Sequence, residues 1–190
     1  MIFFTSDLHL SHKRIAEVRQ FPSVEIMDEL IIANWNKTVN DNDVVYVLGD
    51  VSLHLRGEEF ARILNRLNGK RFYLVPGNHD KLKNLPSGQF NILDHVACIS
   101  IEKTPVVLCH YAMLVWPKSH YGSYFLYGHS HGGLRGKAGF LGKAVDVSLD
   151  CWEYTPVSWD RIKTLMISKP DNFNLLKKTD EVWPPQDEPN

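Results

Sequence analysis

The run Gly-His-Ser-His-Gly at residues 128–132 constrains the fold more than any other feature of this chain. It directly follows the apolar stretch at residues 124–127, which has the length of a buried strand. Two histidines separated by one residue cannot share a helix face, but on an extended or turning backbone they point the same way. The flanking glycines indicate a sharp turn or a closely approaching segment. The run is typical either of a strand that delivers two imidazoles to a metal or of a polar hairpin loop.

The composition indicates one folded domain and argues against a long nucleic acid or a membrane surface as the partner. Of the 190 residues, 44% are hydrophobic and 11% aromatic, which suffices for a substantial core. The formal net charge is −1, so no basic footprint indicates a long nucleic acid or a membrane surface. Cys98, Cys109 and Cys151 are widely spaced and odd in number. This spacing argues against a disulfide framework and a zinc ribbon.

The two ends of the chain carry their own signals. The N-terminus has no positively charged leader region, and no apolar run approaches the length of a membrane span. We therefore expect a cytoplasmic protein. Residues 169–190 are polar and rich in proline, so we expect one domain over residues 1–168 and a tail that is loose or laid over the surface. The sequence assigns no oligomeric state and no role to this tail.

The first half of the chain alternates between strand and helix patterns. Apolar or β-branched runs at residues 2–6, 43–48 and 71–75 predict three strands. Apolar residues at helical spacing predict helices at 13–19, at 23–38 with Ser23 as the cap, and at 58–67. This alternation predicts a parallel sheet with right-handed crossovers.

The pattern changes from Asn91 onward. Strands are predicted at residues 91–101, 105–109, 124–127 and 144–148, and the connections between some of them are short. Such connections favour antiparallel or mixed pairing. A last helix is predicted at residues 158–167.

Polar side chains follow five of the predicted strands at the point where each strand ends. Open α/β sheets bind ligands just outside the carboxyl ends of their strands, so these side chains are expected to meet at one edge. Packing alone does not explain why so many strands end in aspartate, asparagine or histidine. The residues concerned are Asp7, His9, Asp50, Asn78, His79, Asp80, His110, His129 and His131.

The joint placement of these residues favours a metal site. Taken singly, Asp50 could cap a helix, Asn78 could form a turn, and a histidine could make a local hydrogen bond. Oxygen and imidazole ligands without thiolate suit Mn, Fe, Zn or Mg. The number of such residues exceeds what one catalytic metal with an open position requires. It suits two metals that share a bridging carboxylate.

These motifs resemble, in order, the signature of the calcineurin-like metallophosphoesterase superfamily. The resemblance rests on Asp7-Leu8-His9, Gly49-Asp50, the run at residues 77–80, His110 and the run at residues 128–131. It implies an α/β fold, a four-layer α/β/β/α sandwich of two mixed sheets flanked by helices. This architecture agrees with the change of pattern at Asn91.

The resemblance also implies a role for each residue. Two divalent ions, with Mn expected first and Fe, Zn, Ni or Mg as alternatives, would activate a water that attacks the phosphorus of a phosphate ester. His79 would be the catalytic histidine that is not a ligand, and Asp80 would orient its ring. The first metal would be held by Asp7, His9 and His131, and the second by Asn78, His110 and His129, with Asp50 bridging the two.

The substrate expectation rests on departures from the protein-phosphatase branch of this superfamily. That branch reads Asp-Arg-Gly where Ser52 and His54 stand here, and it usually has glutamate at the position of Asp80. We therefore expect a small phosphodiester substrate, such as a nucleotide or cyclic nucleotide. A phosphomonoesterase acting on small metabolites or on phosphoprotein, and a non-catalytic metal-binding scaffold, are the alternatives.

Two further segments have both a functional and a structural interpretation. His12 lies on the same loop as His9 and is either a substrate contact or a solvated loop histidine. The stretch from Trp116 to Tyr121 either forms a lip over the metals or is a surface loop with a buried tryptophan.

Overall fold

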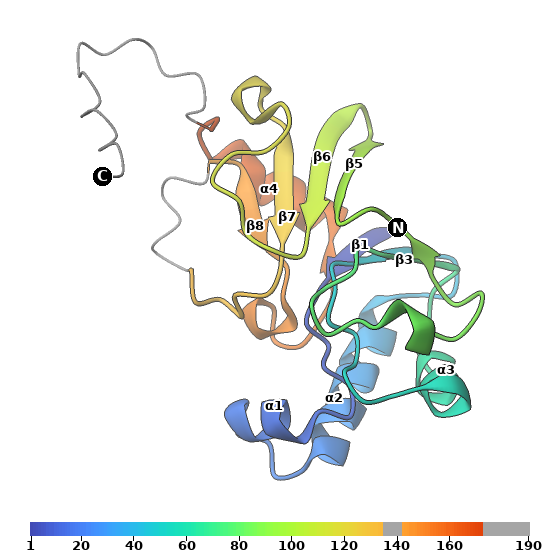
Figure 1. Ribbon diagram of the computed structural model, residues 1–190. Coiled ribbons are helices and arrows are strands. Elements are labelled where there is room, and N and C mark those ends of the chain that lie inside the picture. Colours follow the sequence, from blue (N-terminus) through green and yellow to red (C-terminus); the bar gives the residue numbers. More distant parts are fainter. Residues whose placement is uncertain (135–141, 173–190) are drawn as a thin grey trace, which may run out of the picture.

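The computed structural model describes residues 1–134 and 142–172, which form two β-sheets with helices packed against them (Figure 1). The first sheet has the strand order β4-β3-β2-β1-β9 and the second β5-β6-β7-β8. The first sheet consists of β1 (Ile2–Thr5), β2 (Val44–Val47), β3 (Arg71–Leu74), β4 (Asn91–Ile92) and β9 (Val157–Ser158). The second consists of β5 (Val96–Ile101), β6 (Thr104–Cys109), β7 (Tyr124–Tyr127) and β8 (Ala144–Asp146).

Both sheets are mixed, which confirms the predicted fold class. Strands β1 to β4 pair in parallel, whereas β9 pairs antiparallel with β1. In the second sheet β5 pairs antiparallel with β6, and β6, β7 and β8 are parallel. The single strand predicted at residues 91–101 is wrong. The extended conformation is interrupted between Ile92 and Val96. As a result, β4 belongs to the first sheet and β5 begins the second.

The helices agree closely with the sequence patterns. They are α1 (Lys13–Val18), α2 (Val24–Thr38), α3 (Gly57–Leu64) and α4 (Trp159–Ile167). Ser23 caps α2 as predicted, because its Oγ accepts a hydrogen bond from the backbone N–H of Ile26 at 3.3 Å. Three short 3₁₀ helices complete the described elements: η1 (Leu82–Asn84), η2 (Ser119–Tyr121) and η4 (Leu149–Cys151).

The alternation of side chains along β1 separates two parts of the hydrophobic core. Phe3 packs with the residues of α1, α2 and α3, including Trp35 and Phe60, on one face of the first sheet. Phe4 points to the other face and packs with residues of the second sheet and of α4, such as Leu108 and Ile162. Both faces of the first sheet are therefore buried.

The two sheets meet at the carboxyl ends of their strands. Just beyond β1, Ser6 forms a parallel bridge with Ser148, which lies just beyond β8. The backbone N–H of Ser6 donates to the Val147 carbonyl at 3.1 Å, and the N–H of Leu149 donates to the Ser6 carbonyl at 3.1 Å. The loops that leave β1, β2 and β3 therefore lie close to those that leave β6, β7 and β8.

The stretch from Trp116 to Tyr121 lies away from this seam, and the prediction of a lip over the metals is wrong. Because β6 and β7 are parallel, the chain must return to the far end of the second sheet before β7 begins at Tyr124. Trp116 is 3% exposed, and its ring stacks on Phe125 with the centroids 5.0 Å apart. The alternative interpretation, a surface loop with a buried tryptophan, is the correct one.

Most of the predicted tail, residues 169–190, lies outside the described residues, so the domain boundary at residue 168 stays a prediction. The part that the structure describes packs against the domain. Lys169 donates from Nζ to the Ala144 carbonyl at 2.6 Å, and Asn172 donates from Nδ2 to the Leu114 carbonyl at 2.8 Å. None of the helices in residues 1–134 and 142–172 has the length and apolar character that a membrane crossing requires.

Candidate metal centre

The structure gathers the predicted metal ligands at the seam between the two sheets. They fall into two groups of titratable side chains, and the ligand atoms within each group lie within 4.8 Å of one another. The first group comprises Asp7, His9 and His131, and the second comprises Asp50, His110 and His129.

The first group presents three potential ligand atoms to one point. Oδ1 of Asp7 lies 3.7 Å from Nε2 of His9 and 3.6 Å from Nε2 of His131. The other carboxylate oxygen of Asp7 is occupied, since it accepts hydrogen bonds from Oγ of Ser6 at 2.6 Å and from the N–H of His129 at 2.8 Å. Asp7 and His9 are almost completely buried. One oxygen of Asp7 thus fixes the loops, and the other faces the two imidazoles.

The second group has the same character, with Asn78 beside it. Nδ1 of His110 lies 2.8 Å from the Leu48 carbonyl, which can only accept, so this nitrogen carries the proton. In the neutral ring, Nε2 then presents its lone pair to Oδ1 of Asn78 at 3.0 Å and to Oδ2 of Asp50 at 3.5 Å. A divalent cation bound by these atoms would satisfy the acceptors that face one another here.

Buried atoms of the first group provide a second test of whether metal fits. Among the residues that the structure describes, Oδ1 of Asp7 and both ring nitrogens of His9 are buried without a hydrogen-bond partner. A buried polar atom left in this way costs about 1–3 kcal/mol, which a bound cation would offset for those atoms that ligate it. The donor set of carboxylate, amide oxygen and imidazole also fits a hard or intermediate divalent ion.

The backbone at the ligands is unusual. Asp7, His9, Asp50, His129 and His131 all have positive φ angles, between 46° and 65°, in the left-handed region that side chains other than glycine rarely adopt. Such a concentration of strained residues is typical of functional sites, where the surrounding structure holds them in place.

The glycines beside the ligands are required by close approach, as predicted for the run at residues 128–132. A Cβ at Gly128 would collide with Oγ of Ser6 and with the carboxylate of Asp7. A Cβ at Gly77 would overlap the carboxylate of Asp50. The loops therefore pass one another without room for a side chain.

In the structure, the two histidines of this run, His129 and His131, belong to different ligand groups. The alternation of side chains predicts that they point the same way and meet one metal, but His131 joins the first group and His129 the second. Both residues have left-handed backbone, so the simple period of two does not hold there. The division implied by the family resemblance agrees with this placement.

An ion pair that the sequence analysis missed supports the first group. Nδ1 of His131 lies 2.7 Å from Oδ2 of Asp150, so the ring donates there and keeps its Nε2 lone pair free for a metal. Arg19 donates to Asp150 from Nε at 2.8 Å and from Nη2 at 2.7 Å. The same guanidinium donates to the carbonyls of Asp7 at 2.7 Å and Leu8 at 3.2 Å. Asp150 follows the strand β8 closely, which is the only sequence signal that could have found it.

Asp80 does not orient the ring of His79, and that prediction is wrong. Its carboxylate accepts hydrogen bonds from the backbone N–H groups of Asp50 at 2.7 Å, Val51 at 3.0 Å and Gly77 at 2.9 Å. These bonds hold the loop after β2 against the loop after β3. Asp80 therefore acts on the second group through the backbone and does not reach the ring of its neighbour.

His79 lies between the two groups. Its side chain is 36% exposed, and Nε2 lies 3.9 Å from Oδ2 of Asp50. Its ring centroid is 5.6 Å from that of His9, and its backbone N–H donates to Oδ1 of Asp50 at 2.9 Å. The structure thus places this imidazole beside the ligands, with part of its side chain open to solvent.

The charges around the first group perturb its pKa values. Burial by itself raises the pKa of Asp7, but the imidazoles of His9 and His131 and the Ser6 hydroxyl bring it below its usual value. Burial would lower the pKa of His131, but its hydrogen bond to Asp150 and the charge of Asp7 raise it. These shifts describe the protein without a metal, whose charge would favour neutral, metal-bound imidazoles.

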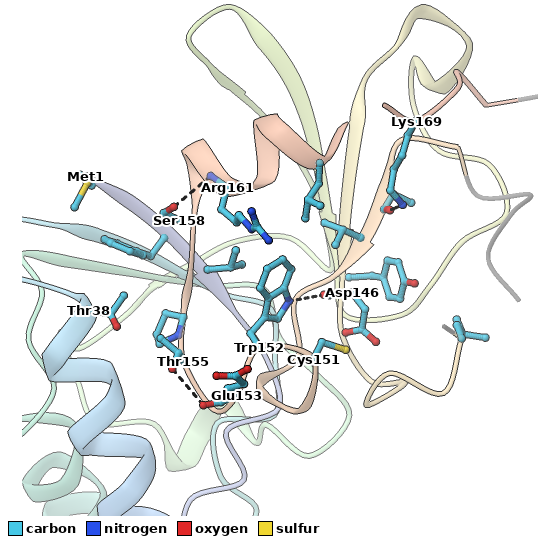
Figure 2. A pocket seen from close by; sticks show the side chains of 18 residues that line it. Met1, Thr38, Asp146, Cys151, Trp152, Glu153, Thr155, Ser158, Arg161 and Lys169 are labelled. Atoms are coloured by element: carbon cyan, nitrogen blue, oxygen red, sulfur yellow. Dashed lines mark hydrogen bonds between the residues drawn. The ribbon is translucent and has the colours of Figure 1, made fainter. Parts of the chain in front are cut away.

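A second feature of the surface lies apart from the metal ligands. A hollow of about 980 Å³ is lined in part by Trp152, Arg161 and Lys169. Figure 2 shows the side chains that line it. Within the described part of the chain, its lining includes none of the predicted ligands. The ligand atoms themselves, not the size of a hollow, identify the candidate metal centre.

Three known proteins are similar to this chain over most of its length. An uncharacterized protein of Methanocaldococcus jannaschii, MJ1445, is 31% identical over 175 residues, covering 87% of this chain and 90% of that protein. The gene 66 protein of Mycobacterium phage D29 is 26% identical and covers 87% of this chain and 95% of that protein. A crystal structure of a protein of unknown function from Aquifex aeolicus, AQ665, superposes with a TM-score of 0.68 at 26% identity, covering 87% of this chain and 98% of that one.

The family profile joins these observations to a class of enzyme. The profile described as calcineurin-like phosphoesterase matches residues 1–183, which include every predicted ligand and both sheets. Together with the two groups of potential ligands, this match supports a metal-dependent phosphoesterase. The chain therefore belongs to the calcineurin-like phosphoesterase family.

Proposed function

We propose that the protein hydrolyses a phosphate ester at a dinuclear metal centre, with Asp50 as the bridging ligand. The observation that carries this proposal is the position of the Asp50 carboxylate between the two groups. Its Oδ2 lies 3.8 Å from Nε2 of His9 in the first group and 3.5 Å from Nε2 of His110 in the second. A carboxylate that faces ligands of both groups suits two ions better than one.

The residues of each group would hold one ion. Asp7, His9 and His131 would bind the first, and His110, His129 and Asn78 the second. When bound, two divalent cations supply an activated water at neutral pH and offset the charge of the phosphoryl oxygens. Mn is our first choice among Mn, Fe, Zn, Ni and Mg, which the same donors would accept.

His79 is proposed as the general acid. Its ring lies beside Asp50 and is partly exposed, so it can approach the leaving oxygen of a bound ester without serving as a ligand. The imidazolium form of His79 would donate a proton to the departing alkoxide or stabilise the phosphoryl charge. The ligand histidines must at the same time be neutral, so we expect a bell-shaped dependence of kcat/KM on pH.

We propose a small phosphodiester, such as a nucleotide or cyclic nucleotide, as the substrate in the cytoplasm. Support comes from the sequence, which lacks the arginine of the protein-phosphatase branch after the bridging acid and has aspartate at residue 80. The near-neutral net charge gives no support to a long polyanionic substrate.

The test compares bis(p-nitrophenyl) phosphate with p-nitrophenyl phosphate. Metal-free protein is reloaded with Mn, and hydrolysis of both esters is followed for the wild type, Asp50→Asn and Asp41→Asn. Asp41 is an exposed carboxylate that precedes β2, at the edge of the sheet away from the ligands, so its variant is the matched control. We expect faster cleavage of the diester, a loss of at least about 1000-fold in Asp50→Asn, and no change in Asp41→Asn.

The alternatives give different results in the same assay. Faster cleavage of the monoester would replace the diester proposal with a phosphomonoesterase. Two bound ions without hydrolysis of either ester would favour a metal-binding scaffold. Full activity with one ion per chain would contradict the dinuclear centre.

A further inference from the structure

Three imidazoles that are not predicted ligands gather beside the first group. The ring of His12 lies 5.6 Å from that of His9, 5.1 Å from that of His54 and 6.2 Å from that of His79, measured between centroids. Neither His12 nor His54 belongs to either ligand group. The two rings therefore extend the metal centre on the side of His9 with groups that the proposed reaction does not use.

The cap of α1 fixes the proton of His12. Its Nδ1 accepts a hydrogen bond from the backbone N–H of Ile15 at 3.3 Å, so the neutral ring carries its proton on Nε2. The side chains preferred at this position are those of serine, threonine, aspartate and asparagine, which cap equally well but present no donor at a distance. The imidazole caps the helix and at the same time presents an N–H group on its opposite edge.

The loop that carries His12 is held firmly. The N–H of His12 donates to the His9 carbonyl at 3.1 Å, and its own carbonyl accepts from Ala16 at 3.1 Å. The N–H of Ser11 donates to both carboxylate oxygens of Asp28, at 3.1 and 2.9 Å. The carboxylate of Asp28 is thereby engaged with this loop, and the position of His12 relative to His9 is set by backbone contacts.

A single hydroxyl brings His54 to His12. Oγ of Ser52 donates to the Leu10 carbonyl at 2.8 Å and accepts from the N–H groups of His54 at 3.4 Å and Leu55 at 3.2 Å. The side chain of Leu55 is buried and anchors the loop, whereas His54 is exposed. The loops after β1 and β2 are thus joined, and each contributes one imidazole to the same patch.

We infer that His12 and His54 form a subsite for a second anionic group of the substrate, a phosphate or a carboxylate, next to the ester that the metals would cleave. The inference rests on the proposed phosphoesterase function and specifies its substrate class. A metal ion is a poor occupant, because Nε2 of His12 carries a proton where a metal needs a lone pair. An anion accepts hydrogen bonds from such N–H groups, and a second phosphate has enough oxygens to accept one from each of the two imidazole rings.

The experiment compares two nucleotides that differ by one phosphate. Binding of thymidine 5′-phosphate and thymidine 3′,5′-bisphosphate to the Mn-loaded protein is measured by calorimetry. The p-nitrophenyl esters of the two 5′-phosphates give the corresponding kcat/KM values. We expect the second phosphate to tighten binding and raise kcat/KM by about tenfold in the wild type, which is the usual effect of one hydrogen bond to a charged group.

His12→Asn is the informative variant, because asparagine retains the cap but removes the reach of the ring. In His12→Asn and in His54→Ala, the bisphosphate should lose its advantage in affinity and in kcat/KM, so that the two nucleotides become nearly equal. His120→Asn, which changes a histidine on η2 at the far end of the second sheet, should keep the full advantage. An equal affinity for both nucleotides in the wild type, or an advantage that survives His12→Asn, would overturn the subsite.

Two further outcomes distinguish the subsite from the proposed reaction and from a third metal site. A binding advantage that depends on His12, without hydrolysis of any ester, would keep the subsite and overturn the proposed phosphoesterase function. A third Mn or Zn ion per chain in the wild type that is lost in His12→Asn would replace the anion subsite with a metal site.

Discussion

The two ligand groups are held in place by different means. The first group is supported by a pair of charged side chains, the charged layer: Arg19 donates a hydrogen bond to Asp150, and Asp150 accepts one from Nδ1 of His131. Behind the second group the supports are backbone groups, since His110 faces the Leu48 carbonyl and Asp80 accepts from three amides. One group depends on an ion pair between side chains that are distant in sequence, and the other on the backbone of neighbouring strands.

These two kinds of support make the two groups vulnerable to different substitutions. The side chain of Arg19 is 2% exposed and makes several charged hydrogen bonds, so the loss of either member of its pair leaves a buried charge. The backbone support of the second group cannot be deleted by one substitution, although the clamp by Asp80 can. We therefore expect changes behind the first group to lower metal affinity as well as stability, and changes behind the second to act mainly on stability.

A loss of activity close to that of Asp50→Asn is expected at His79, the imidazole that lies beside both groups and belongs to neither. His79→Ala should lower kcat about 1000-fold, because a proton donor to the leaving group is lost. Elemental analysis should still find the same number of ions per chain. A proportional loss of metal would make His79 a ligand and would change the composition of the groups being compared.

Asp150→Asn separates the two groups directly. The amide can donate as well as accept, so it no longer enforces the His131 tautomer, and it cannot neutralise Arg19. The affinity of the first site should therefore fall about 10- to 100-fold while that of the second is retained. Calorimetric titration with Mn should show one weakened step. Asp160→Asn, on the exposed face of α4, is the control. Equal weakening of both steps would show that the charged layer supports the centre as a whole.

Asp80→Asn tests the support of the second group. Burial raises the pKa of this carboxyl, and its three backbone donors act against the shift. An amide cannot accept all three hydrogen bonds, so the free energy of unfolding of the metal-free protein should fall by about 2 kcal/mol. Urea denaturation measures the change, with the exposed Asp94→Asn as control. If Asp80→Asn left the stability unchanged but lost one bound ion, Asp80 would support metal binding and not stability, contrary to the role that we assign to it.

A smaller change is expected at the loop that joins the first group to His12. Burial raises the pKa of Asp28 to about 6, so the folded state favours the protonated carboxyl. Its contribution to stability is therefore greatest below about pH 4 and is lost as the pH rises through about 6. After allowance for solvent screening we expect about 1 kcal/mol. Relative to Asp28→Asn, the wild type should become less stable between pH 4 and 7, as thermal melting of metal-free protein would reveal.

Much of the fold was predictable because its elements carry local signals. The strand at residues 124–127 and the capped helix that begins after Ser23 are found where the patterns place them. The two-residue strand β9 was missed and β4 was merged with β5 into one predicted strand, because a pair of residues is too short to show a period of its own. The break between β4 and β5 depends on which sheet completes the pairing, and this is a property of the tertiary structure.

The candidate site divides in the same way. Its potential ligands could be named from the sequence because each follows a strand that ends at the same edge. The pair of Arg19 and Asp150 could not, because 131 positions separate its members and the only local signal is the position of Asp150 shortly after β8. The predicted role of Asp80 is wrong because it was based on the position of Asp80 next to His79 in the sequence. The orientation of the Asp80 carboxylate is instead set by backbone N–H groups of two loops, which the sequence does not reveal.

The bridge between Ser6 and Ser148 also has a consequence for how the protein is made. Asp7 leaves the ribosome well before the strand β8 and before Asp150, the acid that supports His131. Contacts of such long range are slow to form and cannot be anticipated by a partial chain. The first group can therefore be completed only after Asp150 has been synthesised, and an ion bound at this seam would stabilise both sheets together.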